Sequence, residues 1–254
     1  MNNGNDINSE LLRLKSASES ITKQTLNRIL SICDTLIDDE LPAYVKERLA
    51  DIDAGCCKLL RDRALLNRLA DYLSKKATDE KCCSLSDVYA NCCRTIDAIC
   101  GFAGKAFSFS EFIPEYKLNV SAEECCLLLL LPVALAFECD NDNDVRLIAS
   151  RKGDKLELEY TFKGKVPPVE KLAAECGKTD SSSGLYFTDS LLALALKETV
   201  ADCGASLSVN NNKLTVQLTA ADKNAIVNSA AESYIDNRFS LPYIMLAGIV
   251  RREI

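Results

Sequence analysis

The feature of this chain that most constrains its fold is a repeat of apolar side chains between residues 45 and 73. The repeat alternates spacings of four and three residues, the heptad pattern of a helix that buries one stripe against other helices. One charged side chain, Arg63, interrupts it. The apolar positions that we assign to the stripe are Val45, Leu49, Ile52, Cys56, Leu59, Leu66 and Leu73.

A further helix is expected before this one, over residues 7–37. An acidic turn that ends at Pro42 separates the two, and proline suits a first helical turn because it lacks the N–H that such a turn leaves unbonded. Residues 1–77 therefore predict an antiparallel helical hairpin. One hairpin cannot bury the stripe fully, so we expect two chains to pair into a dimeric four-helix bundle. Packing of the stripe within one chain is the alternative.

The following residues alternate helix and strand signals, which indicates an α+β domain. Two capping-box patterns, Ser84 with Asp87 and Ser121 with Glu124, predict the starts of two helices. The second helix contains five consecutive leucines, and Pro132 inside it is expected to kink it or interrupt its regular bonding.

Further elements follow from alternation and turn residues. Period-two alternation predicts β-hairpins within residues 145–162 and 206–218. Residues 190–203 predict a helix that ends at Gly204, and residues 165–184 predict a loop because they carry proline, serine and glycine clusters.

Composition and charge exclude several classes of protein. The net charge of -7 argues against a nucleic-acid binder, which needs a basic surface. The longest apolar run, residues 125–137, has 13 residues and is too short to span a bilayer. Residues 1–8 are polar and carry no secretory signal. We therefore expect a cytoplasmic protein that engages neither nucleic acid nor membrane.

Thirteen cysteines, eight of them in four adjacent pairs, invite a redox or metal interpretation. None of the CxxC or CxxxxC spacings typical of zinc sites occurs, so no metal site is expected. The simpler interpretation is that the thiols serve as small hydrophobic side chains. A cysteine-based redox or metal sensor is the weaker alternative.

Three strings carry a resemblance over roughly residues 10 to 220: TLNRILSICDTLIDDELPAYVKERLADI, YKLNVSAEECCLLLLLPVALAFE and LLALALKETVADCGASLSV. In order and spacing they resemble bacterial two-component sensor histidine kinases. The resemblance implies a dimerisation hairpin at 1–77 followed by a degenerate ATPase domain of the GHKL type, an α/β sandwich, at 78–220. Residues 221–254 form a C-terminal extension beyond the usual end of the family.

The functional motifs of that family are altered here. The phosphoacceptor string HELRTPLN matches residues 20–27, which places Ser20 at the histidine position, and the chain contains no histidine at all. The asparagines that help to hold magnesium match Leu129 and Val133. Neither apolar side chain can coordinate a hard cation, which takes oxygen ligands.

The two glycine-containing motifs of the family are altered as well. The adenine-recognition string DxGxGI matches residues 161–166, with Thr161 at the aspartate and Lys163 and Lys165 at the glycines. The lid string GLGL matches residues 190–193, with Ser190 and Leu192 at its glycines. The backbone N–H cradle for phosphate is therefore not expected.

The resemblance and its alterations together predict a catalytically inactive, histidine-kinase-like signalling protein. It is expected to act as a homodimer that binds a response regulator or a genuine histidine kinase, with no catalytic residue and no cofactor. The enzyme alternative is a diverged nucleotide-binding kinase or ATPase that uses ATP and magnesium through unrecognised groups.

Overall fold

The computed structural model describes most of the chain between residues 22 and 249, with Asp71 and Leu73 described only as backbone. It divides into two compact units, Met1–Leu60 with Arg251–Ile254, and Arg61–Val250. Helix α2 (Ala43–Leu73) contributes to both. The residues that the structure describes are 22, 24–33, 35–36, 40–73, 81–111, 115–176, 187–222, 224–229, 240–246 and 249.

The first unit contains a helical segment over residues 24–33 and the first half of α2. Leu26, Leu30 and Cys33 are buried on the first helix, and Cys33 lies close to the buried Cys56 of α2. Helix is therefore present within 7–37 where the structure describes it. Ser20 lies outside the described residues, and the predicted boundary after residue 77 stays a prediction.

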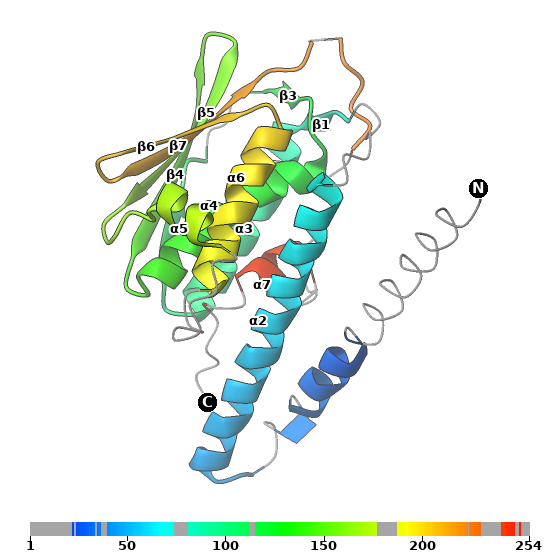
Figure 1. The fold of residues 1–254 in the computed structure, drawn as a ribbon, viewed down its shortest axis with the longest axis vertical. Coiled ribbons are helices and arrows are strands. Elements are labelled where there is room, and N and C mark those ends of the chain that lie inside the picture. The colour runs from blue at the N-terminus through cyan, green and yellow to red at the C-terminus, as the bar shows by residue number, and fades with distance from the viewer. Residues whose placement is uncertain are drawn as a thin grey trace, which may run out of the picture. The chain divides into compact units, whose positions relative to one another are not determined.

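The second unit is built on a five-stranded mixed sheet in the order β2-β4-β5-β7-β6 (Figure 1). Only β2 and β4 run parallel, and the other neighbours are antiparallel. A separate two-stranded sheet pairs β1 with β3. The strands are β1 (Cys83–Ser84), β2 (Ala106–Phe109), β3 (Lys117–Leu118), β4 (Asp144–Lys152), β5 (Lys155–Phe162), β6 (Ser206–Asn210) and β7 (Lys213–Thr219).

Both predicted hairpins are confirmed, as β4–β5 and β6–β7. Their turns contain Gly153 at φ 67° and Asn211 at φ 53°, two residue types that tolerate the left-handed region. The three strands β1, β2 and β3 were not predicted. They have two to four residues each, too few to display a period-two pattern.

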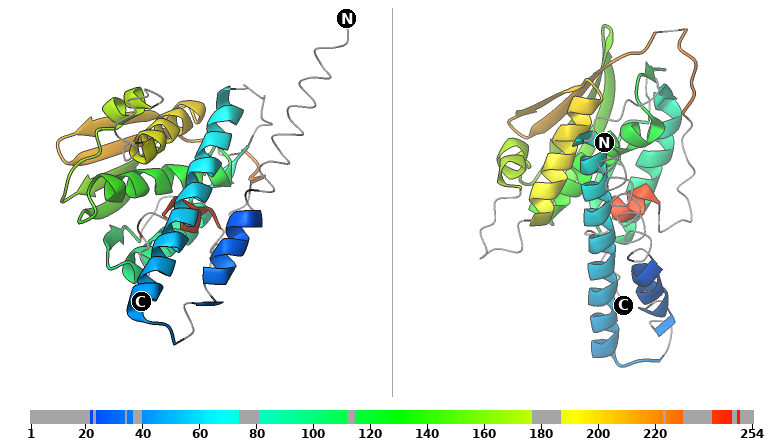
Figure 2. Two further views of the ribbon diagram at one scale, coloured as in Figure 1. Left: turned by 60° about the horizontal axis from the view of Figure 1, so that its bottom comes forward. Right: turned by 45° about the vertical axis from the view of Figure 1, so that its right-hand side comes forward.

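Helices cover one face of the sheet (Figure 2). The three main ones are α3 (Leu85–Phe102), α4 (Ala122–Cys139) and α6 (Phe187–Asp202). Helix α4 packs against both α3 and α6 and is the central one. Two short helices complete the layer: α5 (Val169–Glu175) packs on α6, and α7 (Leu241–Met245) packs on α3 and α4.

The two capping-box predictions had different outcomes. At α4 the box is confirmed: Glu124 N donates to Ser121 Oγ at 3.1 Å, and Ser121 N donates to Glu124 Oε2 at 2.7 Å. At α3 the predicted helix start is confirmed, with Ser84 as the N-cap, but the capping box is wrong, because the Ser84 hydroxyl caps nothing and lies 2.9 Å from Ser86 Oγ. The first N–H of that helix, on Leu85, instead donates at 2.9 Å to the carbonyl oxygen of Tyr116, the residue before β3.

The loop predicted over residues 165–184 was wrong for its middle part. Helix α5 begins directly after Pro168, and Val169, Leu172 and Ala173 are buried on its inner side. Proline at a helix start is favourable, so Pro167-Pro168 preceded a helix and did not mark a loop. Residues 177–186 lie outside the described residues.

Pro132 lies inside α4, and the helix continues on both sides of it. Proline has no N–H, so the carbonyl four residues earlier, Leu128 O, loses its helical donor. Tyr160 of β5 replaces that donor, because its buried hydroxyl donates to Leu128 O at 2.8 Å. The interruption expected at Pro132 is therefore confined to one carbonyl, which the sheet satisfies. Among the described residues, no helix is long and apolar enough to cross a membrane.

We predict that Tyr160→Phe lowers the free energy of unfolding by about 1–3 kcal/mol, because it leaves a buried carbonyl without a donor. Urea unfolding followed by circular dichroism measures the change. In a Pro132→Ala background, residue 132 regains an N–H for Leu128 O, so the same Tyr160→Phe substitution should cost much less. Equal costs in the two backgrounds would contradict this account of Pro132.

Candidate functional site

The positions that match the nucleotide-site motifs lie on three neighbouring elements of the second unit. Helix α4 packs on both α6 and β5, so the fold brings these elements together. Leu129 and Val133 of α4 and Leu192 of α6 are completely buried in the hydrophobic core. These three positions therefore contribute apolar packing, and none supplies an oxygen ligand for a cation.

Thr161 lies on β5 between Tyr160 and Phe162, whose side chains are buried. Successive side chains of a strand point to opposite faces of the sheet. Thr161 is half-buried and is therefore on the face opposite to the helices. Ser190 is buried in the first turn of α6.

Two side chains that follow α4 hold the loop at residues 163–165. Asn143, 2% exposed, accepts from Gly164 N at 2.9 Å and donates through Nδ2 to Lys165 O at 2.8 Å. Asp140 Oδ2 accepts from Lys165 N at 2.9 Å. The backbone N–H groups of Gly164 and Lys165, which a phosphate cradle would direct at its ligand, are therefore bonded to protein side chains.

The lysines of this loop are only partly available. Lys163 is exposed but forms an ion pair with Asp144 at the start of β4, and its N–H donates to Asp144 O at 3.1 Å. The N–H of Lys165 lowers the pKa of Asp140, whose carboxylate accepts it. Asp140 and Asn143 were not predicted as candidate-site residues. Their signal was the run of aspartate and asparagine at residues 140–144, directly after the apolar helix.

Buried thiols occupy the contacts between α3, α4 and β1. Cys92 Sγ and Cys126 Sγ lie 3.3 Å apart, both fully buried. Burial raises the pKa of Cys100 and Cys203, each to about 12. The thiolate is the reactive form of cysteine, so the thiols of Cys100 and Cys203 stay protonated and unreactive near neutral pH. Within the described ranges, no group of three or more cysteine, aspartate or glutamate side chains is arranged to hold a metal ion.

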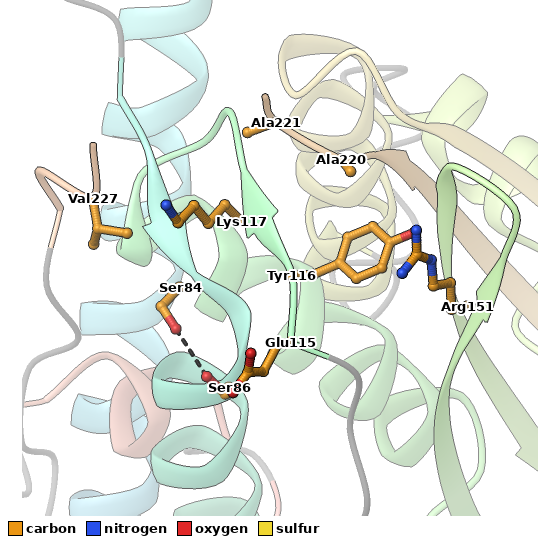
Figure 3. A pocket seen from close by; sticks show the side chains of 9 residues that line it. All are labelled: Ser84, Ser86, Glu115, Tyr116, Lys117, Arg151, Ala220, Ala221 and Val227. Carbon is orange, nitrogen blue, oxygen red and sulfur yellow. Dashed lines mark hydrogen bonds between the residues drawn. The ribbon is translucent and has the colours of Figure 1, made fainter. Parts of the chain in front are cut away.

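Two adjacent cavities lie at the start of α3, away from the nucleotide-site positions. They measure about 430 and 370 Å³ and share Ser84, Ser86 and Val227. Figure 3 shows the larger one. Lys117 of the larger cavity donates to Ala225 O at 2.8 Å, and Arg151 lies over the Tyr116 ring at 5.1 Å. The cations of this cavity are thus engaged with the protein itself.

No protein-family model matches the sequence, and no curated protein matches it significantly. Solved structures do match its fold. Full-length ShkA in complex with AMPPNP aligns with a TM-score of 0.53 and 15% identity, over 84% of this chain and 46% of ShkA. The histidine kinase AdeS of Acinetobacter baumannii aligns with a TM-score of 0.50 and 10% identity, over 78% of this chain and 97% of AdeS.

A third match is histidine kinase ThkA in complex with response regulator protein TrrA, with a TM-score of 0.49 and 11% identity. It covers 85% of this chain and 65% of ThkA. At such identities the likeness concerns the fold alone. The sheet and its helical layer have the fold of histidine kinase ATPase domains.

We predict that Gly164→Ala destabilises the protein by about 1–3 kcal/mol, because overpacking forces neighbours to move. A Cβ at this position would overlap Asp140 Oδ2 and would lie 3.0 Å from Asn143 Oδ1. Chemical denaturation measures the loss. Gly101→Ala is the matched control, since its Cβ would meet nothing within 4 Å, and it should be neutral or stabilising. Equal effects of the two substitutions would refute a tightly held 163–165 loop.

Proposed function

We propose that this protein is a catalytically inactive, histidine-kinase-like signalling protein that acts in the cytoplasm by binding other proteins. The observation that carries the proposal is a joint loss in a preserved fold. The chain has no histidine, while the positions for the two magnesium-binding asparagines are the buried Leu129 and Val133. An error of alignment in one motif cannot restore an imidazole.

The chemistry of phosphoryl transfer explains why the joint loss matters. The reaction is catalysed mainly by positioning and by cations that neutralise the charge on the transferred group. It also needs an acceptor nucleophile, and serine is a weak one without an adjacent base. In the loop at 163–165, the N–H groups of Gly164 and Lys165 already bond to Asn143 and Asp140. Leu192 carries a buried side chain where a glycine would let the backbone approach a phosphate closely. The acceptor nucleophile, the cation ligands and the backbone contacts to phosphate are therefore all impaired in the same chain.

A binding role is supported by the surface of α2. Ile52, Leu59 and Leu66 are 47%, 58% and 47% exposed, and their seven-residue spacing places them on one stripe of the helix. Large apolar side chains in a continuous exposed row mark an interaction surface. We propose that a second copy of the chain covers this row, as a homodimer that forms a four-helix bundle.

The other positions of the predicted stripe are less exposed. Val45 and Leu49 are half-buried, and Cys56 is buried beside Cys33 of the same unit. The side chain of Leu73 lies outside the described residues. The proposed dimer contact therefore rests on a row narrower than the full heptad set.

The partner that we propose for the dimer is a response regulator or a genuine histidine kinase. The competing proposal is a diverged ATPase that retains nucleotide binding. Its support is the likeness of the fold to histidine kinase ATPase domains. Titration of the protein with nucleotide separates the two proposals.

We predict that Leu59→Glu dissociates the dimer, because it places an unpaired charge in an apolar contact. Multi-angle light scattering at micromolar concentration should give twice the chain mass for the parent protein and the single mass for the variant. Ile226→Glu is the control, since Ile226 is 83% exposed and belongs to the second unit, whereas Leu59 belongs to the first. A monomeric parent protein would exclude the dimer.

We predict that ATP with magnesium at about 1 mM leaves the melting temperature unchanged, since a ligand stabilises only in proportion to its binding. Incubation with labelled ATP should leave no phosphate on the chain, and a response regulator or histidine kinase should still be retained by the immobilised protein. A rise of several degrees would establish nucleotide binding. Incorporated label that Ser20→Ala abolishes would overturn the proposal of inactivity.

A further inference from the structure

The second half of α2, from Arg61 onward, belongs to the ATPase-like unit in its packing. Leu65 and Leu69 are buried in the same hydrophobic cluster as α3, α4 and the sheet. They lie one turn apart and face the body together. This contact is separate from the exposed row on α2, because Leu66 points about 100° around the helix from Leu65.

Arg61 adds a buried ionic contact at one end of this face. Its side chain is 1% exposed, and Nη1 donates to Glu138 Oε1 at the end of α4 at 2.8 Å. Nε is 3.5 Å from Asp62 Oδ1, and Nη2 is buried with no hydrogen-bond partner. A buried guanidinium is tolerable only beside its counter-charge. Displacement of this segment from α4 would therefore separate the pair in a partly buried setting.

Arg68 makes the second ionic contact, two turns further along α2. Its Nη1 is 2.5 Å from Glu123 Oε1, and its Nη2 is 3.7 Å from Glu124 Oε1, both at the start of α4. Its Nε donates to Tyr72 OH at 2.7 Å. The Tyr72 hydroxyl lies 3.3 Å from Thr199 Oγ1 on α6. One network thus joins α2 to both neighbouring helices.

The two arginines contact opposite ends of α4. Glu123 and Glu124 are in its first turn, and Glu138 is next to its last residue. Two ionic contacts that far apart, with Leu65 between the arginines and Leu69 next to Arg68, oppose rotation as well as separation. A single contact would leave the helix free to pivot about it.

We propose that Arg61, Leu65, Arg68, Leu69 and Tyr72 form a built-in clamp that fixes residues 61–73 of α2 to α4 and α6. The ATPase-like body then cannot swing relative to this helical segment. Transfer between a bound nucleotide and an acceptor would require the reacting atoms to approach within about 3.5 Å. The clamp opposes any such movement that changes the angle between α2 and α4. The inference stands independently of the proposed partners.

Hydrogen exchange of the full chain, read by mass spectrometry on peptides that cover 61–73, tests the clamp. Amides of a segment that docks loosely exchange faster than those of the core, whereas those of an integral helix exchange with it. We expect residues 61–73 to be protected as strongly as α4. Exchange at least about tenfold faster than α4 in the parent protein would overturn the proposal.

The double variant Arg61→Gln/Arg68→Gln should accelerate exchange of 61–73 at least about tenfold, because breaking buried pairs is costly. Arg63→Gln is the control on the same helix; it removes one arginine charge outside the clamp, and it should leave the rate unaltered. Equal rates in the double variant and the control would overturn the clamp. Acceleration confined to 61–73, with α4 still protected, would support it.

Arg61→Gln leaves Glu138 without its cation and can unfold the whole body. Loss of the cooperative melting transition in the double variant, with Arg63→Gln still folded, would also support the clamp as an integral contact. Arg68→Gln alone is the milder variant, because the Arg68 side chain is 21% exposed. It should accelerate exchange in residues 65–73 only, and the parental rate there would count against the clamp.

Discussion

The structure depends on the burial of α4. Every residue of this helix from Cys125 to Phe137 is buried, so it has no polar face to turn toward water. A helix that is apolar all round must be enclosed on all sides. The sheet, α3, α6, α7 and the second half of α2 each cover one part of it. The arrangement of these elements therefore follows from the sequence of α4, which has no face suited to the protein surface.

The same burial determines what the candidate site can do. A helix that supplies metal ligands must direct polar groups toward a solvated pocket, and that leaves part of its surface open. Leu129 and Val133, which we matched to the magnesium-binding asparagines, are buried apolar side chains that belong to the core. Glu124 and Glu138 lie near the two ends of α4, and both contact arginines of α2. The ionic contacts of this helix therefore lie near its ends, and the side chains in its middle serve packing.

Local patterns in the sequence were sufficient for several elements. The Ser121–Glu124 capping box, the β4–β5 hairpin and the end of α6 near Gly204 depend on residues within a few positions of one another. Failures came where a distant group decided the outcome. Leu85 N is satisfied by Tyr116 O, so Ser84 need not cap α3, and Arg61 is paired with Glu138 across 77 positions. The heptad interpretation of α2 likewise missed Leu65 and Leu69, because a period locates a face but not the partner that covers it.

Helix α2 carries both the contact that we propose to be rigid and the apolar row that we propose to bind a second copy of the chain. Its 61–73 segment directs Leu65 and Leu69 into the body, while Ile52, Leu59 and Leu66 form a separate exposed row on the same helix. The clamp that we propose would hold Leu66, which lies within the clamped segment, in one orientation against the body, and a group held in place before binding loses less entropy on binding. In the binding role that we propose, such a fixed presentation is an advantage, whereas phosphoryl transfer that had to bring donor and acceptor together would lose the motion it needs.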